Sequence, residues 1–164
     1  MSSRASFPHL VARFFGVLTA RPLRPIEQQQ VAGWLDNEVE GALFWDQSSA
    51  DQRHGYIAAA AVAARLPERR DVIRAALLHD VGKRHARLGV IARSFASLVG
   101  LFGGSGRGRV AAYLDHGRRA APELADAGAE AVVVDYARHH HATRPSTIDQ
   151  ATWDLLQAAD RASR

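Results

Sequence analysis

The sequence predicts an all-α fold in one domain, and three observations on its 164 residues support this class. Apolar residues recur at intervals of three or four through most of the chain, as on the buried face of a helix. Strict alternation of apolar and polar residues, which is typical of half-buried strands, is absent, and no repeat is detectable. The length suits a single core. We therefore expect a helical bundle over residues 24–164, preceded by an amphipathic helical extension over residues 1–23.

The apolar stretch from Phe7 to Ala20 accounts for this extension. Its apolar residues have helical spacing, but Arg13 interrupts it and it is too short to span a bilayer. It also lacks the cleavage site of a signal peptide. We expect it to pack on the domain, with membrane contact through residues 7–20 as the alternative. No other segment resembles a membrane span, so we expect a cytoplasmic protein.

The next three helices follow from periodicity and capping residues. Helical spacing predicts one helix over 26–44, with Pro25 near its first turn. Serines and an aspartate at 48–51 offer N-caps for a second helix that ends at Leu66. Pro67 then opens a third helix that runs to Asp80. The apolar residues expected to face inward in the first helix are Val31, Trp34, Leu35, Val39 and Leu43.

A glycine-rich loop at 103–109 lies among the predicted helices of the C-terminal half. We interpret the loop as a connector, because it lacks the Gly-Lys-Ser/Thr of a P-loop; phosphate capture by Arg107 or Arg109 is the alternative. Thr147 and Gln150 resemble a capping box that starts the last helix. The other helices are predicted near 92–101, from 110 through His116, from Pro122 to about Gly128, and over 129–141.

Composition narrows the chemistry of the protein. The chain has no cysteine, so it has no disulfides and any metal site must use histidine and carboxylate ligands. Its net charge of +4 favours a small anionic partner. A long basic stripe with interleaved aromatic residues is absent, which argues against a large nucleic acid. The sequence does not indicate an oligomeric state.

The most informative motif is His79-Asp80-Val81-Gly82-Lys83, at the end of an apolar helical run. Adjacent nitrogen and oxygen ligands suit a divalent metal, and a carboxylate at such a place is costly without a cation or hydrogen-bond donors. Lys83 is the only lysine among 21 basic residues. Its compact charge would suit a cramped site beside a metal and a phosphate better than a guanidinium would.

Further candidate ligands lie on other predicted helices, so only folding can bring them together. Metal sites in helical bundles are built in this way, from inward side chains of facing helices. Nitrogen and oxygen donors suit divalent ions such as Mn, Fe, Co, Ni, Zn or Mg. The candidates beyond the motif are His54, His116, His139, His140 and Asp160.

The order His, His-Asp, His, His, Asp over about 52–160 resembles the HD-domain superfamily of metal-dependent phosphohydrolases. This resemblance implies a helical bundle of the HD type, a core ligand set of His54, His79, Asp80 and Asp160, and Lys83 near the scissile phosphate. It also implies His116 with the His139-His140 pair as extra ligands of two-metal members, such as HD-GYP phosphodiesterases. The pair His140-His141 is the alternative register, and no Gly-Tyr-Pro follows the triplet.

The function expected from this resemblance is hydrolysis of a phosphoester of a nucleotide or a cyclic or linear dinucleotide by metal-activated water. Two ions would share Asp80, and Lys83 would neutralise a phosphate oxygen. Arg107, Arg109 or Arg144 would hold the rest of the substrate. The alternatives are a one-metal nucleotidase and a catalytically weak regulatory protein of the same fold that binds nucleotides.

Overall fold

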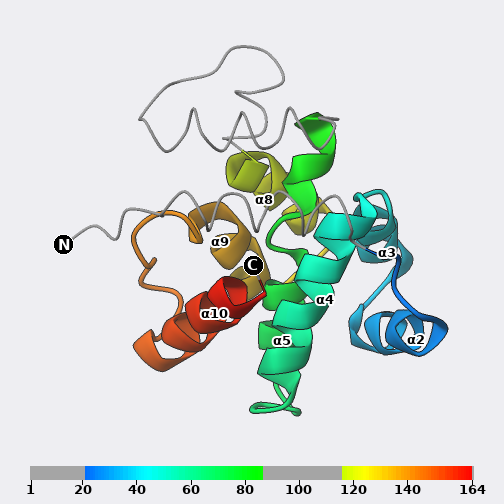
Figure 1. Cartoon of the computed structure of the whole chain (residues 1–164). Helices are drawn as coiled ribbons and strands as arrows, with labels where there is room; N and C mark the ends of the chain where they lie inside the picture. Colours follow the sequence, from blue (N-terminus) through cyan, green and yellow to red (C-terminus); the bar gives the residue numbers. More distant parts are fainter. Residues whose placement is uncertain (1–20, 87–115, 164) are drawn as a thin grey trace, which may run out of the picture.

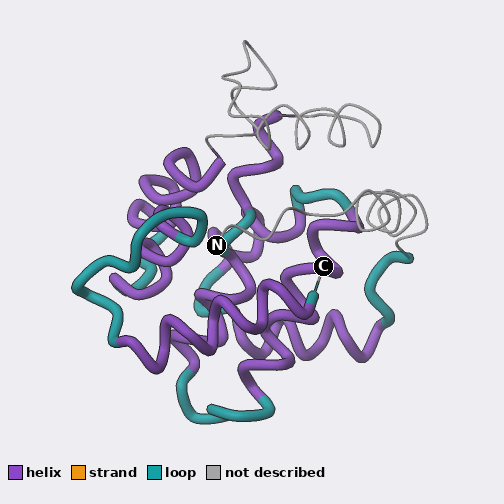
Figure 2. The backbone as a smooth tube through the Cα atoms, turned by 60° about the vertical axis from the view of Figure 1, so that its left-hand side comes forward, coloured by secondary structure: helices purple, strands orange, loops and turns teal. Residues whose placement is uncertain are grey.

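The computed structural model describes residues 21–86 and 116–163. Within these ranges every regular element is a helix, and loops or turns join the helices (Figure 2). The predicted all-α class is therefore confirmed. None of the described helices is both long and apolar enough to cross a membrane. The helices are α2 (Pro25–Trp34), α3 (Glu38–Trp45), α4 (Ser49–Ala63), α5 (Arg70–Leu78), the 3-10 helix η1 (Val81–Ala86), α8 (His116–Asp126), α9 (Ala131–His139) and α10 (Gln150–Ala162).

Several predicted features lie outside the described residues. They are the helical extension at 7–20, the helix near 92–101, the loop at 103–109 with Arg107 and Arg109, and the helix start at 110–115.

Helix α5 is the centre of the bundle. It packs against α4, α9 and α10, while α8 packs against α9 and η1 (Figure 1). Seven consecutive residues of α5, from Val72 to Leu78, are buried. A helix that is buried on all sides lies in the interior of its domain. The residues that follow α5, His79 and Asp80, therefore also lie inside the protein.

The single helix predicted over 26–44 is wrong, because the structure has two helices there. Asn37 interrupts the segment, and its side-chain oxygen accepts the backbone N–H groups of Val39 and Glu40 at 3.0 Å each. This N-cap starts α3 in a new direction, although the apolar spacing continues across the break. As a result Val39 is 54% exposed instead of facing the core.

Other helix ends also differ from the prediction. Asp149, rather than Thr147, caps α10, because its carboxylate accepts the N–H of Thr152 at 2.9 Å. The hydroxyl of Thr147 instead donates to Asp135 at 2.6 Å. Pro122 lies within α8 rather than opening a helix, since the buried residues of that helix, among them Leu124, keep it packed through the proline.

The helix predicted to open at Pro67 begins instead at Arg70 and ends at Leu78. The helix predicted over 129–141 spans Ala131–His139. Helix α8, which the structure describes from His116 on, continues to Asp126, past the residue at which the prediction ended a helix.

A buried ion-pair network fixes α5 against its neighbours. The Arg74 side chain is only 2% exposed, and its guanidinium contacts the fully buried carboxylate of Glu40 on α3. The same guanidinium lies 2.6 Å from a carboxylate oxygen of Glu130, at the start of α9. Three elements are therefore joined by one charged group, which has an interior partner in Glu40 and a half-exposed partner in Glu130.

We predict that Arg74→Ala lowers the free energy of unfolding by about 3–5 kcal/mol, because it leaves the Glu40 charge buried without its partner. Arg65→Ala is the matched control, since Arg65 is exposed on the surface. Urea denaturation of both variants measures the difference. A loss for Arg74→Ala no larger than for the control would show that the network does not stabilise the fold.

Candidate metal centre

Four side chains from three helical segments form one cluster. Asp80 and His79 follow α5 directly and are both almost completely buried. Asp80 Oδ2 lies 3.4 Å from Nε2 of His54 and 3.5 Å from Nε2 of His79. Asp160 Oδ1 on α10 lies 3.1 and 3.4 Å from the same two nitrogens. We call His54, His79, Asp80 and Asp160 the first group.

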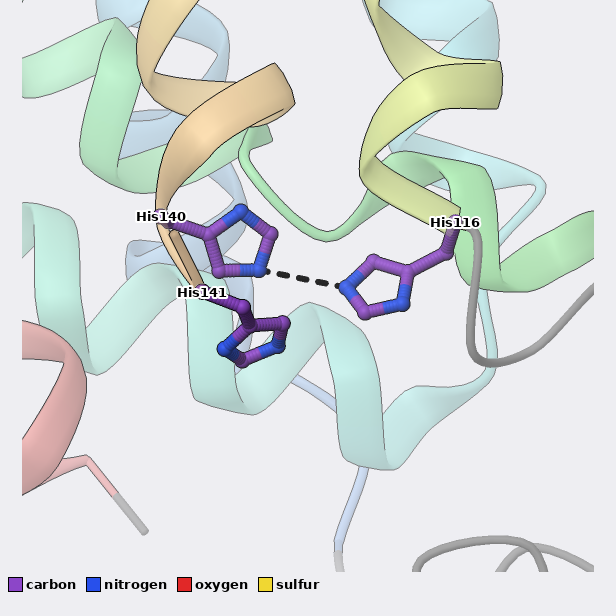
Figure 3. A group of neighbouring side chains, drawn as sticks. All are labelled: His116, His140 and His141. Atoms are coloured by element: carbon purple, nitrogen blue, oxygen red, sulfur yellow. Dashed lines mark hydrogen bonds between the residues drawn. The ribbon is translucent and has the colours of Figure 1, made fainter. Parts of the chain in front are cut away.

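The other carboxylate oxygen of Asp80 faces a second set of histidines. Asp80 Oδ1 lies 3.0 Å from Nε2 of His116 and 3.6 Å from Nε2 of His140. These two nitrogens are 3.1 Å apart, and the His141 ring faces the same space (Figure 3). We call His116, His140 and His141 the second group. Asp80 thus presents one oxygen to each group.

The donor atoms fit divalent metal ions. In each group three ligand atoms from different residues lie within 4.8 Å of one another. Within the described ranges Asp80 Oδ1 is buried and has no hydrogen-bond partner, although two imidazole nitrogens lie close to it. Unpartnered buried oxygen is costly, and a cation held by the oxygen and the imidazole lone pairs would remove that cost. Buried His and Asp side chains here could therefore hold a metal.

The histidine rings are oriented by their second nitrogens. The Nδ1 atom of His79 lies 2.8 Å from the carbonyl oxygen of Ala76, and that of His140 lies 2.9 Å from the carbonyl oxygen of Ala137. A carbonyl only accepts, so each Nδ1 carries a proton and each Nε2 is the nitrogen that faces the site. Metal-binding histidines commonly have such outer partners.

Charge and burial in the site favour the ligating forms of Asp80 and His140. Burial alone would raise the pKa of Asp80, but the positive charges of Lys83 and His79 hold it well below its usual range. The Lys83 ammonium contacts Asp80 Oδ2 directly. Burial lowers the pKa of His140 to about 4, so this ring is neutral near pH 7. Burial acts in the same direction on His79, but Asp80 and Asp160 outweigh it and raise that pKa.

Three glycines allow the ligand-bearing segments to approach closely. A Cβ atom on Gly55, next to His54, would lie 2.6 Å from the carbonyl oxygen of Leu77. A Cβ on Gly82 would overlap the carbonyl oxygen of His116, and one on Gly117 would overlap that of Ala137. Each glycine therefore lets one ligand-bearing backbone touch the next. The sequence analysis missed this role, although His54 and His116 are each followed directly by glycine.

The structure brings together most of the candidates that the sequence singled out. Both groups consist of predicted ligands, with Lys83 beside them, except at the histidine triplet. There the clustered pair is His140 and His141, which was the alternative register, and His139 is not part of either group. The triplet spans the end of α9, so helical periodicity no longer sets the direction of its side chains.

The predicted substrate contact of Arg144 differs from its position in the structure. Its guanidinium donates to the carbonyl oxygen of Ile148 and so holds its own loop together. His85, which is not among the predicted ligands, lies 2.8 Å from a carboxylate oxygen of Glu123.

Comparison of the chain with protein-family models, curated proteins and solved structures finds no match. The resemblance to the HD-domain superfamily therefore depends on the ligand series and its spacing alone.

We predict that Gly82→Ala destabilises the metal-free protein by about 1–3 kcal/mol, the usual cost of inserting atoms into a packed site. The added methyl group must push η1 away from the His116 backbone. Gly33→Ala is the matched control on α2, where a Cβ meets nothing within 4 Å and alanine should stabilise the helix by up to about 1 kcal/mol. Urea unfolding in the presence of a chelator measures both. Equal stability of the two variants would contradict the close approach of η1 and α8.

Proposed function

We propose that this protein is a metal-dependent phosphohydrolase that cleaves a phosphoester of a nucleotide or a cyclic or linear dinucleotide. The observation that carries this proposal is the position of Asp80, whose two carboxylate oxygens each face a separate group of histidines. A carboxylate shared between two ligand sets is suited to hold two ions close together, and paired ions are used for in-line displacement at phosphorus.

The first group would hold one ion and the second group, with Asp80, the other. Bound divalent ions would promote hydrolysis in two ways: they lower the pKa of a water molecule and neutralise charge on the phosphoryl oxygens. The protein supplies the ligand geometry and a buried site from which bulk water is largely excluded. The least buried side chains of the site are those of His54, Lys83 and His141, so the substrate would enter past them.

Lys83 would bind a non-bridging phosphate oxygen of the substrate. Its side chain is 15% exposed, and its ammonium contacts Asp80 Oδ2. A compact ammonium on a flexible stem can move from Asp80 to a phosphate without leaving the site. Positive charge aimed at phosphoryl oxygens stabilises the transition state more than the ground state.

A one-metal nucleotidase is the second candidate, because the donor sets of the two groups are unequal and favour metal binding in the first group. The first group has two carboxylates, from Asp80 and Asp160, whereas the second adds three imidazoles, one of them exposed, to the shared Asp80 oxygen. A divalent cation is attracted more strongly to two carboxylates than to one. For a simple monoester substrate, one ion in the first group would be sufficient.

We predict that Asp80→Asn removes bound metal and hydrolytic activity together. The loss should exceed the roughly 10–100-fold effect of removing an outer-shell partner, because Asp80 itself would contact the ions. Elemental analysis gives the metal content, and bis-p-nitrophenyl phosphate and p-nitrophenyl phosphate with Mn²⁺ report diester and monoester hydrolysis. Asp126→Asn, an exposed change on α8, is the control.

Retention of metal by Asp80→Asn would contradict the ligand assignment. Metal binding by the wild-type protein with no turnover of nucleotides, dinucleotides or either model ester would instead favour a regulatory nucleotide-binding protein. Two ions with diester turnover support the two-metal enzyme, and one ion with monoester turnover supports the nucleotidase.

We also predict that His141→Ala reduces the metal content from two ions to one, whereas His139→Ala leaves it at two. The two residues have the same side chain and lie two positions apart, but only His141 belongs to the second group. Elemental analysis of both purified variants makes the comparison. Loss of an ion in His139→Ala alone would restore the His139-His140 register.

A further inference from the structure

We propose that Ser163 positions His54 as a metal ligand by accepting a hydrogen bond from its Nδ1 and so fixing the orientation of the ring. Ser163 ends α10, and its hydroxyl oxygen lies 2.9 Å from Nδ1 of His54. The backbone carbonyl oxygen of the same serine lies 3.3 Å from that nitrogen. As a metal-ligand claim, this inference rests on the proposed function.

The donors and acceptors of Ser163 determine which atom donates in its hydrogen bond with His54. Its hydroxyl has a single proton, which it donates to the carbonyl oxygen of Asp160 at 2.9 Å. The remaining capacity of the hydroxyl is to accept, and the carbonyl oxygen can only accept. Both Ser163 atoms near His54 are therefore acceptors, and Nδ1 of His54 is the donor.

The hydrogen bond from Nδ1 leaves Nε2 as the nitrogen that faces the first group. Nε2 of His54 lies 3.1 Å from Asp160 Oδ1 and 3.4 Å from Asp80 Oδ2, and both oxygens accept hydrogen bonds. A bound ion would displace the proton that these acceptors favour on Nε2, while Ser163 keeps the proton on Nδ1 and holds the ring in place. Ser163 touches neither substrate nor metal, so it is a positioning residue.

His54 depends on this contact more than the other rings depend on theirs. His79 and His140 are held by carbonyl oxygens three residues earlier in the chain, and no side-chain substitution removes these partners. The partner of His54 lies 109 residues away, on the helix that also carries Asp160. One end of α10 therefore supplies a ligand of the first group and orients another.

The test uses the full-length protein and Mn²⁺ alone as the probe. Ser163→Ala should weaken the binding of one ion by roughly 10–100-fold and leave the other unchanged. Ser163→Thr, which retains the hydroxyl, should restore the affinity, whereas Ser163→Val, of the same shape without it, should not. Ser146→Ala, at an exposed loop serine, is the control. Electron paramagnetic resonance of free Mn²⁺ measures binding, and wild-type affinity in both the alanine and valine variants would overturn the inference.

A second readout is independent of metal. Nitrogen-15 spectra of the imidazoles in the metal-free protein should show a hydrogen-bonded proton on Nδ1 of His54 in the wild type. In Ser163→Val that hydrogen bond should weaken, because only the longer contact to the backbone carbonyl oxygen is left. A wild-type ring without a proton on Nδ1 would overturn the inference whatever the metal results. If the wild type binds no Mn²⁺, the proposed function fails, and the state of Nδ1 alone decides the hydrogen-bond assignment.

Discussion

The buried carboxylate of Asp80 is the constraint on which the rest of the structure depends. It follows a helix with no solvent-facing side, so its charge must be balanced within the protein. Lys83 and the surrounding histidines supply that balance, and the segments that carry them must all reach the same point. Helices α4, α8, α9 and α10 therefore surround the end of α5, and the candidate site and the hydrophobic core are built on the same helix (Figure 1).

Close backbone contact makes this convergence sterically feasible. Gly55, Gly82 and Gly117 remove the side chains that would otherwise separate neighbouring segments. In the middle of the bundle's central helix, Arg74 compensates the buried charge of Glu40 and holds α3 in place. The candidate site is thus supported by close packing, which brings the ligands together, and by the buried Arg74–Glu40 ion pair, which fixes helix α5.

The histidine rings are oriented in two physically different ways. His79 and His140 use carbonyl groups of their own helical turn, so local backbone geometry is enough to orient them. His54 uses Ser163, which only tertiary packing brings near. Orientation of the first group therefore depends on correct docking of α10 onto α4, and of the second on the end of α9 and its contact with α8.

The sequence by itself determined the all-helical class, because apolar spacing reports which face of a segment is buried. It also singled out most of the residues that cluster around Asp80, because a His-Asp pair at the end of an apolar helix is expected to lie in the protein interior. Tertiary structure alone decided the split at Asn37 and the choice of His140 and His141 over His139. At helix ends, capping hydrogen bonds and contacts with other helices set side-chain directions, and periodicity contains no information about either.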